Sequence, residues 1–168
     1  MTDAITTRSN PLSPLHGKVA LITGAGQVIG QGIAFSLAKR GVSIVAVGRT
    51  LSKCEKTVAD IEARFNGKAV AIECDISNLD ALDAVVSNAV AAFGRLDILV
   101  NNAGILRDKS FSKGSVEDFR LVADVHLMGT VHCTKACWDI MKEQEYGRIV
   151  VTSSSSGLYG NFGQTNYG

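Results

Sequence analysis

Residues 19–32 read VALITGAGQVIGQG and join a short apolar run to a glycine-rich turn. The run at 19–22 has the length of a buried strand, and it stops at Gly24. Beyond the turn, apolar residues return at helical spacing over residues 33–38, and Gly41 ends that pattern. The stretch therefore predicts a strand, a tight turn and a helix in succession.

The same alternation continues along the chain. Apolar runs separated by helical patterns are typical of parallel strands in a sheet that helices cover on both faces. Right-handed crossovers then wind such a sheet in both directions. The predicted fold class is α/β, with a doubly wound, mostly parallel sheet that is Rossmann-like. The further predicted strands are residues 43–47, 69–73, 97–100 and 148–152, and the further helices are 51–65, 79–93 and 116 to about 141.

Composition excludes several classes of protein. The 168 residues suit one domain, and 17 Lys and Arg against 16 Asp and Glu leave a formal charge of +1. This balance argues against a nucleic-acid-binding protein, which works by neutralising phosphates. No apolar run approaches the roughly 18 residues of a spanning helix, and the start, MTDAITTRSN, lacks a secretory pattern. We expect no nucleic-acid or membrane partner and a cytoplasmic location, with the peroxisome and mitochondrion as alternatives.

The four cysteines are Cys54, Cys74, Cys133 and Cys137, and none belongs to the C-x-x-C spacing of zinc or redox sites. Cys133 and Cys137 are four residues apart in a helical pattern, so they share a face and are predicted to be small core residues. Reduced thiols fit a cytosol-like compartment. No metal site is predicted.

The glycine-rich turn is the first place to expect a ligand, because ligands of doubly wound sheets lie beyond the carboxyl ends of the strands. Glycines let the backbone approach a pyrophosphate, and the helix start that follows offers free N–H groups. The turn departs from G-x-G-x-x-G, since residue 29 is an isoleucine. An ordinary strand-to-helix turn is therefore the alternative.

Polar segments after three later strands favour a ligand site. Asp75 follows the third predicted strand, residues 101–104 (Asn-Asn-Ala-Gly) follow the fourth, and the serines at 153–156 follow the fifth. Tyr167 comes thirteen residues after Ser154. Because all of these follow strand ends, they are predicted to converge on one cleft.

Together these segments resemble the short-chain dehydrogenase/reductase family, without gaps from Gly17 to Gly168. The resemblance implies an NAD(P)-dependent oxidoreductase that acts on a small-molecule substrate and interconverts a secondary alcohol and a ketone. The family's T-G-x-x-x-G-x-G turn is matched at Thr23, Gly24 and Gly30, its N-N-A-G at residues 101–104, and its paired Ser and Tyr at Ser154 and Tyr167.

A narrower likeness concerns the substrate. Residues 101–108, 124–127 and 157–164 resemble the (3R)-hydroxyacyl-CoA dehydrogenase branch, which includes the dehydrogenase part of multifunctional fatty-acid oxidation enzymes. The resemblance implies a 3-hydroxyacyl or 3-oxoacyl thioester and a role in fatty-acid metabolism. A steroid or other alcohol dehydrogenase of the same family is an alternative.

Three catalytic roles are implied by the resemblance. Hydride transfer from an alcohol carbon leaves a proton to move, and a tyrosine can take it only if nearby positive charge lowers its pKa; Tyr167 is the implied base. Ser154 is the implied hydrogen-bond donor to the substrate oxygen, with one hydroxyl of a polar serine run as the alternative. His126 stands where most relatives carry an asparagine that anchors a water in the proton relay. An imidazole can also bond a water, and a structural helix histidine is the alternative.

The resemblance also implies the cofactor contacts. Asp75 resembles the residue that bonds the adenine amino group, and Asn102 the one that lies along the adenosine ribose. A cap for the following helix is the alternative for Asp75. The other implied cofactor contacts are Thr23, Gly24, Gly26, Gln27, Ile29, Gly30, Ile76, Ala103 and Gly104.

The choice of cofactor depends on the end of the second predicted strand. An NAD enzyme is expected to place Asp or Glu there to hold the ribose 2′-hydroxyl. This chain has Gly48-Arg49, and an arginine can pair with a 2′-phosphate. We therefore predict NADP, with Arg49 at its phosphate, and keep NAD as the alternative that the hydroxyacyl-CoA likeness favours.

Val28 is a departure from the family, which has glycine at this position. A β-branched residue does not readily adopt a positive φ, and forcing it costs on the order of 1–3 kcal/mol. Its methyl groups would also crowd the cofactor phosphates or the adjoining backbone. The hypothesis from sequence is therefore weakened cofactor binding.

The end of the chain is a second departure. The family's lysine, four residues after the tyrosine, would be residue 171, beyond Gly168. We therefore expect a fragment: a flexible N-terminal arm over the polar residues 1–16, and an incomplete Rossmann-type dinucleotide-binding domain over 17–168. The C-terminal strands would then be missing and the fifth strand would be an exposed edge.

The sequence thus indicates the front portion of a short-chain dehydrogenase/reductase, whose parent protein is expected to be a homo-oligomer. The alternative from another class is a catalytically inactive nucleotide-binding or interaction fragment. Val28 and the missing lysine favour the inactive fragment, whereas Ser154, Tyr167 and the N-N-A-G segment favour the enzyme.

Overall fold

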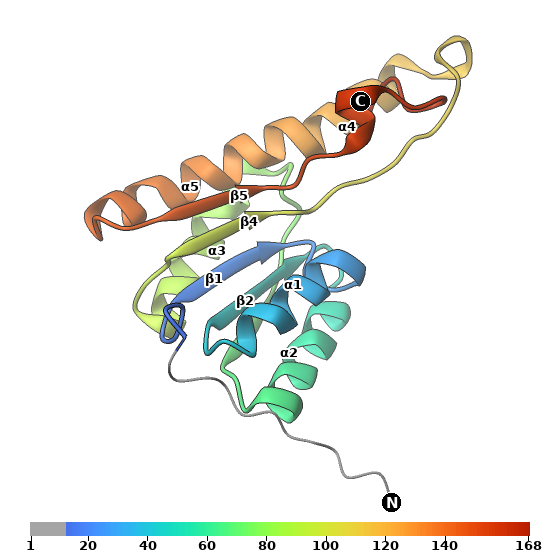
Figure 1. The fold of residues 1–168 in the computed structure, drawn as a ribbon. Helices are drawn as coiled ribbons and strands as arrows, with labels where there is room; N and C mark the ends of the chain where they lie inside the picture. The colour runs from blue at the N-terminus through green and yellow to red at the C-terminus, as the bar shows by residue number, and fades with distance from the viewer. Residues whose placement is uncertain (1–12) are drawn as a thin grey trace, which may run out of the picture.

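A computed structural model of the chain describes residues 13–168. Its centre is a five-stranded sheet in the order β3-β2-β1-β4-β5, and every neighbouring pair is parallel. From β1 the chain adds β2 and β3 on one side and then returns to add β4 and β5 on the other, so the topological switch point lies between β1 and β4 (Figure 1). This confirms the predicted doubly wound α/β class. The strands are β1 (Val19–Thr23), β2 (Ser43–Gly48), β3 (Ala69–Glu73), β4 (Ile98–Asn101) and β5 (Arg148–Val151).

Helices cover both faces of the sheet. In Figure 1, α1 and α2 lie on one face, and α3 and α5 lie on the other. The long helix expected from residue 116 is present, but a π-helical segment divides it into α4 and α5. The helical elements are α1 (Val28–Ala38), α2 (Leu51–Phe65), α3 (Leu79–Phe93), the 3₁₀ turn η1 (Phe111–Lys113), α4 (Val116–Ala123), the π segment η2 (Asp124–Met128), α5 (Gly129–Glu143) and the short α6 (Ser155–Tyr159).

The side chains of the apolar strands pack into two separate cores, because successive side chains point to opposite faces of a sheet. Along β1, Val19 and Leu21 pack into the core beneath α3 and α5. Ala20 and Ile22 pack into the core beneath α1 and α2. Burial on both faces explains why this strand reads as a continuous apolar run rather than an alternating one.

The edge strand β5 differs from the others. All four of its residues are exposed, although three of them are apolar. The expected exposed edge at the fifth strand is therefore confirmed. At the other end of the chain, residues 1–12 of the predicted arm lie outside the described residues. Residues 13–17 form a turn, and Leu15 packs against the core beneath α1 and α2.

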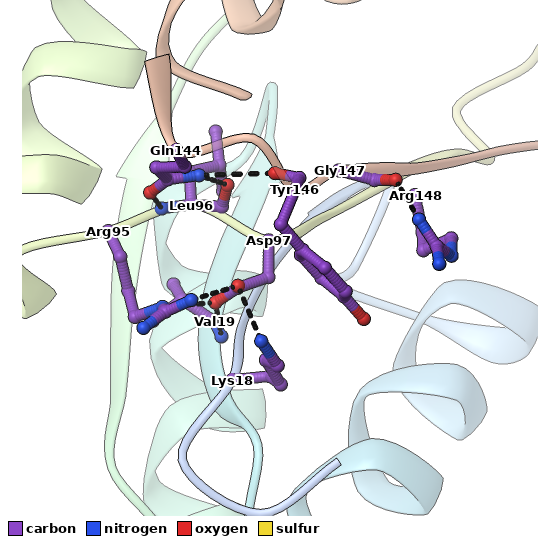
Figure 2. A network of polar contacts seen from close by, with 9 residues as sticks. All are labelled: Lys18, Val19, Arg95, Leu96, Asp97, Gln144, Tyr146, Gly147 and Arg148. Atoms are coloured by element: carbon purple, nitrogen blue, oxygen red, sulfur yellow. Dashed lines mark hydrogen bonds and ion pairs between the residues drawn. The ribbon is translucent and has the colours of Figure 1, made fainter. Parts of the chain in front are cut away.

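A buried carboxylate joins the amino ends of β1 and β4. These ends lie opposite the carboxyl ends of the strands, where the sequence predicts the ligand site. The side chain of Asp97 is fully buried, and it accepts hydrogen bonds from Arg95 Nε (2.7 Å), Lys18 Nζ (3.2 Å) and the backbone N–H of Val19 (2.9 Å) (Figure 2). Burial alone would raise the pKa of Asp97, but these hydrogen bonds outweigh it and hold the pKa below its usual value.

The same cluster extends to the loop before β5. Lys18 Nζ lies 3.7 Å from the centre of the Tyr146 ring, and Arg148 stacks on that ring at 4.7 Å. Gln144 accepts from the backbone N–H of Leu96 and donates to its carbonyl, as Figure 2 shows. The amino ends of β1, β4 and β5 are thus held together by polar contacts.

All four cysteines are free and buried. The predictions of reduced thiols and of buried positions for Cys133 and Cys137 are therefore confirmed, and Cys54 and Cys74 are buried as well. Burial raises the pKa of Cys133 to about 12, and the neighbouring Cys74 adds to the shift. Burial, with Cys133 beside it, raises the pKa of Cys137 to about 12 as well. Among residues 13–168, no helix is both long and apolar enough to cross a lipid bilayer.

Replacing Asp97 with asparagine should destabilise the fold at neutral pH by about 1–3 kcal/mol, because it removes the charge-assisted hydrogen bonds from Arg95 and Lys18 to a buried carboxylate. The native pKa of Asp97 lies below the unfolded value, so its stabilisation is complete above about pH 4 and is lost as pH falls through the native pKa. Urea unfolding at pH 7 and at acidic pH measures this difference, which should shrink in acid.

The matched control is Asp118→Asn, which removes a carboxylate from an ion pair with Lys109 at the surface. This variant should unfold at nearly the wild-type urea concentration, since exposed ion pairs contribute little. An Asp97→Asn variant as stable as the control at pH 7 would contradict the role given to the buried cluster.

The native thiols should not react with a disulfide reagent such as DTNB at pH 8. Only a thiolate attacks, and burial keeps Cys133 and Cys137 protonated at that pH. Absorbance of the released thionitrobenzoate measures the reaction, and the urea-unfolded chain, which should release it rapidly, is the control. Rapid release from the folded chain would show that these thiols are accessible.

Candidate active site

A groove of about 580 Å³ lies at the carboxyl ends of the strands, within the range of small-molecule sites. It contains all the site residues predicted from the sequence except Thr23 and Ser154. The predicted residues that line it are Gly24, Gly26, Gln27, Ile29, Gly30, Arg49, Asp75, Ile76, Asn102, Ala103, Gly104, His126 and Tyr167. The expected convergence of the strand ends on one cleft therefore holds for most of the set.

Thr23 lies beneath the groove rather than in its lining. Its side chain is fully buried, and Oγ1 accepts hydrogen bonds from the backbone N–H groups of Asn102 and Ala103, both at 3.0 Å. The same hydroxyl donates to the carbonyl of Val100 at 3.3 Å. The amide of Asn102 in turn donates to the carbonyl of Thr23 at 3.0 Å. Thr23 thus holds the N-N-A-G segment against the end of β1.

Glycines allow this close approach of the two segments. Gly24 has φ +68°, and a Cβ there would lie 3.0 Å from Cα of Ala103. A Cβ on Gly30 would collide with the carbonyl oxygen of Gly24. The first turn of α1 therefore packs directly on the backbone of the glycine-rich turn, and the first three residues of α1 line the groove.

Val28 adopts the conformation that the sequence made improbable for valine. Its φ is +45°, in the left-handed region, and its side chain is 79% exposed while lining the groove. No packing contact compensates a side chain so exposed. The expected backbone strain is therefore confirmed, and the branched side chain stands at the rim of the groove.

His126 and Tyr167 meet at the end of the groove. The centroids of their rings are 5.1 Å apart, with the rings edge to face, and Tyr167 is half-buried. Nε2 of His126 lies 3.0 Å from the backbone nitrogen of Ile105 and 2.8 Å from its carbonyl oxygen. One tautomer accepts from that N–H and the other donates to that carbonyl. The ring also fills the space that a Cβ on Gly104 would need.

The π segment η2 presents His126 to the groove. Single π turns inside helices occur frequently at functional sites. Here the hydroxyl of Thr130 donates to the carbonyl of His126 at 2.7 Å, so it provides a partner for a carbonyl where the regular helix is interrupted. The sequence periodicity predicted a helix here but not its interruption.

Ser154 is the candidate catalytic residue that the groove lining does not include. It is the N-cap of α6, and its Oγ accepts the backbone N–H of Ser156 at 3.2 Å. The structure therefore brings His126 and Tyr167 together and places Ser154 at the start of the short helix between β5 and Tyr167. This short helix was not predicted from the sequence.

Two cations follow β2 and one carboxylate follows β3. Arg49 and Lys53 both line the groove, and Lys53 Nζ donates to Gln27 Oε1 at 2.8 Å. Asp75 accepts from the backbone N–H of Ser77 at 3.0 Å and from its hydroxyl at 2.8 Å. The backbone hydrogen bond is the main reason that the pKa of Asp75 lies below its usual value, and the hydroxyl and the charge of Arg49 act in the same direction.

Lys53 and Asn101 line the groove but were not among the site residues predicted from the sequence. Lys53 follows Arg49 by one helical turn, a spacing that would have placed both cations at one helix start. Asn101, the first residue of N-N-A-G, is only 5% exposed and lines the groove. Its Nδ2 lies 3.4 Å from the hydroxyl of Thr134, and its Oδ1 has no partner among the described residues.

Comparison with known proteins places this arrangement in a family. The family model described as short chain dehydrogenase matches residues 18–168. The chain belongs to the short-chain dehydrogenase family. Its fold, its glycine-rich turn and the groove at the carboxyl ends of β1 and β4 are thus those of an oxidoreductase family.

Three relatives of this short-chain dehydrogenase chain illustrate the range. It is 46% identical over 166 residues to "Peroxisomal multifunctional enzyme type 2" of Mus musculus, covering 92% of this chain and 22% of the relative. It is 38% identical to "3-oxoacyl-[acyl-carrier-protein] reductase" of Synechocystis, covering 93% and 63%. The solved structure "Crystal Structure of NAD+-Bound Xylitol Dehydrogenase" is similar with a TM-score of 0.89 and 33% identity, covering 93% of this chain and 60% of that one. The chain thus spans less than two thirds of each relative.

Replacing Val28 with glycine should have two separable effects. Relief of the positive φ should raise the free energy of unfolding by about 1 kcal/mol. Removal of the side chain at the groove rim should lower the dissociation constant for NADPH. Chemical denaturation measures the first effect, and a titration of NADPH fluorescence measures the second.

Val28→Ala is the matched control for this pair of effects. Alanine keeps a Cβ, and with it the positive-φ cost, but it removes the two methyl groups. It should therefore tighten NADPH binding without recovering the full stability gain. If glycine leaves the affinity for NADPH unchanged, crowding at the rim is ruled out.

Proposed function

We propose that this chain binds a nicotinamide dinucleotide and forms the catalytic front of an enzyme that interconverts a 3-hydroxyacyl and a 3-oxoacyl thioester. The observation that carries the proposal is the single groove in which the glycine-rich turn, the N-N-A-G segment and Tyr167 meet. The name of the Synechocystis relative, which is a 3-oxoacyl reductase, supports an acyl substrate and with it the proposed role in fatty-acid metabolism. A steroid or other alcohol is the alternative substrate in the same groove.

The groove fits a dinucleotide in three respects. The glycines at positions 24 and 30 bring the backbone N–H groups of the α1 start to the groove, where a pyrophosphate is stabilised. Asp75 offers a carboxylate to an adenine amino group at the β3 end. The buried Oδ1 of Asn101 is an acceptor with no partner among residues 13–168, as expected where a ligand or a water supplies the donor.

NADP is the proposed cofactor, and NAD is the alternative. Arg49 and Lys53 place two cations at the end of β2 and the start of α2, where a 2′-phosphate would lie. No Asp or Glu occurs between Ser43 and Cys54, so no carboxylate is present there to hold a free 2′-hydroxyl. The solved relative that names NAD⁺ in its title supports the alternative.

The residues at the end of the groove supply proton transfer. A bound nicotinamide would supply the hydride acceptor, and the chain must remove the hydroxyl proton of the substrate. In the proposal the Tyr167 phenol takes this proton. Ser154 Oγ already accepts the Ser156 N–H, which leaves its own O–H free to donate to the substrate oxygen. His126, in contact with Tyr167, is the proposed proton carrier toward solvent.

A catalytically inactive nucleotide-binding fragment remains the second candidate, and the positive φ of Val28 favours it. A strained residue at the rim weakens dinucleotide binding without abolishing the fold. The peroxisomal names of several relatives favour a peroxisomal location, and the Synechocystis reductase carries no such name. We therefore keep the cytoplasm as the proposed location, with the peroxisome as the alternative, and a homo-oligomeric parent protein as a further proposal.

The two cations give a direct test of cofactor choice. The wild-type chain should bind NADPH more tightly than NADH, because the 2′-phosphate adds charge-assisted hydrogen bonds. Arg49→Ala and Lys53→Ala should each weaken NADPH binding by about tenfold, equivalent to roughly 1.4 kcal/mol, and leave NADH binding nearly unchanged. Lys39→Ala, an exposed lysine at the other end of α1, is the control. A clear preference for NADH would defeat the NADP proposal.

Turnover separates the enzyme from the inactive alternative. In the parent protein, with a 3-hydroxyacyl thioester and NADP⁺, absorbance of the reduced nicotinamide should rise, and Tyr167→Phe should lower the rate by about 10²–10⁴ while leaving NADPH affinity unchanged. Tyr159→Phe, a tyrosine 85% exposed on α6, is the matched control and should keep the wild-type rate. Binding of NADPH without any turnover would favour the inactive fragment.

A further inference from the structure

Gln164 joins three segments around Tyr167. We propose that Gln164 is a positioning residue, whose side-chain amide fastens the turn that carries Tyr167 to the loop after β4 and so sets the ring of Tyr167 against His126. Its role in catalysis rests on the proposed function of Tyr167, whereas the geometry it enforces is measurable without turnover.

The side chain of Gln164 has three partners. Oε1 accepts from the hydroxyl of Ser156 at 2.8 Å and from the amide of Asn161 at 2.9 Å. Nε2 donates to Oδ2 of Asp108 at 3.0 Å. The first two partners belong to α6 and the residues after it, and Asp108 belongs to the loop that follows β4. One amide therefore links segments that are more than fifty residues apart in the chain.

Backbone contacts lead from the same residue to Tyr167. The carbonyl of Gln164 accepts the N–H of Tyr167 at 3.0 Å, so the two residues belong to one turn. Two further hydrogen bonds join the loop after β4 to this turn. The backbone N–H of Lys109 donates to the carbonyl of Gly163 at 2.8 Å, and the side-chain amide of Asn166 donates to the carbonyl of Arg107 at 3.0 Å. In Figure 1 the end of the chain runs beside this loop.

These contacts form a closed series at the end of the groove, which begins and ends at His126. His126 bonds the backbone of Ile105, the loop runs from there to Asp108, Asp108 bonds Gln164, and Gln164 begins the turn to Tyr167. The ring of Tyr167 then returns to His126 at 5.1 Å. The Asp108–Gln164 hydrogen bond joins the loop after β4 to the turn that carries Tyr167 through two side chains, beside the Lys109–Gly163 and Asn166–Arg107 contacts. Its loss should therefore loosen this turn and displace the phenol from the imidazole.

The charge of Asp108 determines which way the Gln164 amide points. An ionised carboxylate only accepts hydrogen bonds, so Nε2 must face Asp108 and Oε1 must face the two donors. Glutamate at position 164 would keep the contacts to Ser156 and Asn161 but would set one carboxylate against another. Asparagine at position 108 would then restore a donor to that pair. The link is thus testable by exchange of the two side chains.

The test is the proton nuclear Overhauser effect between the rings of Tyr167 and His126, measured on the full chain. Each chain has only three histidines, so the imidazole signals are few and are assignable by substitution. We expect the contact in the wild type, its loss in Gln164→Glu, and its return in the double variant Asp108→Asn with Gln164→Glu. Asp108→Ala removes the same hydrogen bond from the loop side and should also lose the contact, which covers the case that Gln164→Glu does not fold.

Gln144→Ala is the matched control, because Gln144 also links two segments through its amide, but at the opposite end of the sheet. It should lower the melting temperature and leave the Tyr167–His126 contact intact. The proposal is overturned if the contact is absent in the wild type, if it survives both Gln164→Glu and Asp108→Ala, if the double variant does not restore it, or if Gln144→Ala removes it equally.

The same samples separate this proposal from the proposed function. Failure of the wild-type chain to bind NADPH counts against the proposed function and leaves the ring contact unaffected. Loss of the ring contact in Gln164→Glu, together with unchanged NADPH binding, supports Gln164 as a residue that positions Tyr167 without holding the dinucleotide.

Discussion

The hydroxyl of Thr23 is the contact on which the candidate site depends. It accepts two backbone N–H groups from the N-N-A-G segment and donates to a carbonyl of β4, all from a position with no exposure to solvent. A parallel sheet pairs β1 with β4 along their length but leaves the polar groups beyond their ends without ladder partners. Thr23 provides those partners, so the glycine-rich turn and the N-N-A-G segment lie against each other instead of opening apart.

Much of this arrangement could be predicted because burial on both faces of the sheet leaves a strong signal. The run at 19–22 is apolar at every position, since alternate residues pack into two different cores. The helix ends are a second signal, because Asn66 and Gly94 end α2 and α3 in the left-handed conformation that their residue types favour. Asp75, Asn102 and Tyr167 could be assigned to one cleft because parallel strands all end at the same edge.

Other features left no such signal. The π turn at His126 depends on how its carbonyl is satisfied by Thr130, a contact within an otherwise regular apolar pattern. The spacing of Lys53 from Arg49 is a weak signal, because Lys53 lies on an exposed helix face where any polar residue satisfies the periodicity. Thr23 and Ser154 matched a motif, yet one proves to be buried beneath the groove and the other caps a helix, because a motif gives residue type and spacing but not the direction of a side chain.

The amino ends and the carboxyl ends of the strands differ in stability and strain. At the amino ends, Asp97 is fully paired in a buried cluster. At the carboxyl ends, Val28 is strained, and the side-chain oxygen of Asn101 has no hydrogen-bond partner in the described part of the chain. Strain and unsatisfied groups persist only where the surrounding structure over-determines them. The contacts of Thr23 provide that constraint beside the candidate site, and the cluster at Asp97 joins the same strands at their other ends. The carboxyl ends can therefore hold an unfavourable backbone at Val28 and an unpaired amide oxygen at Asn101 without unfolding.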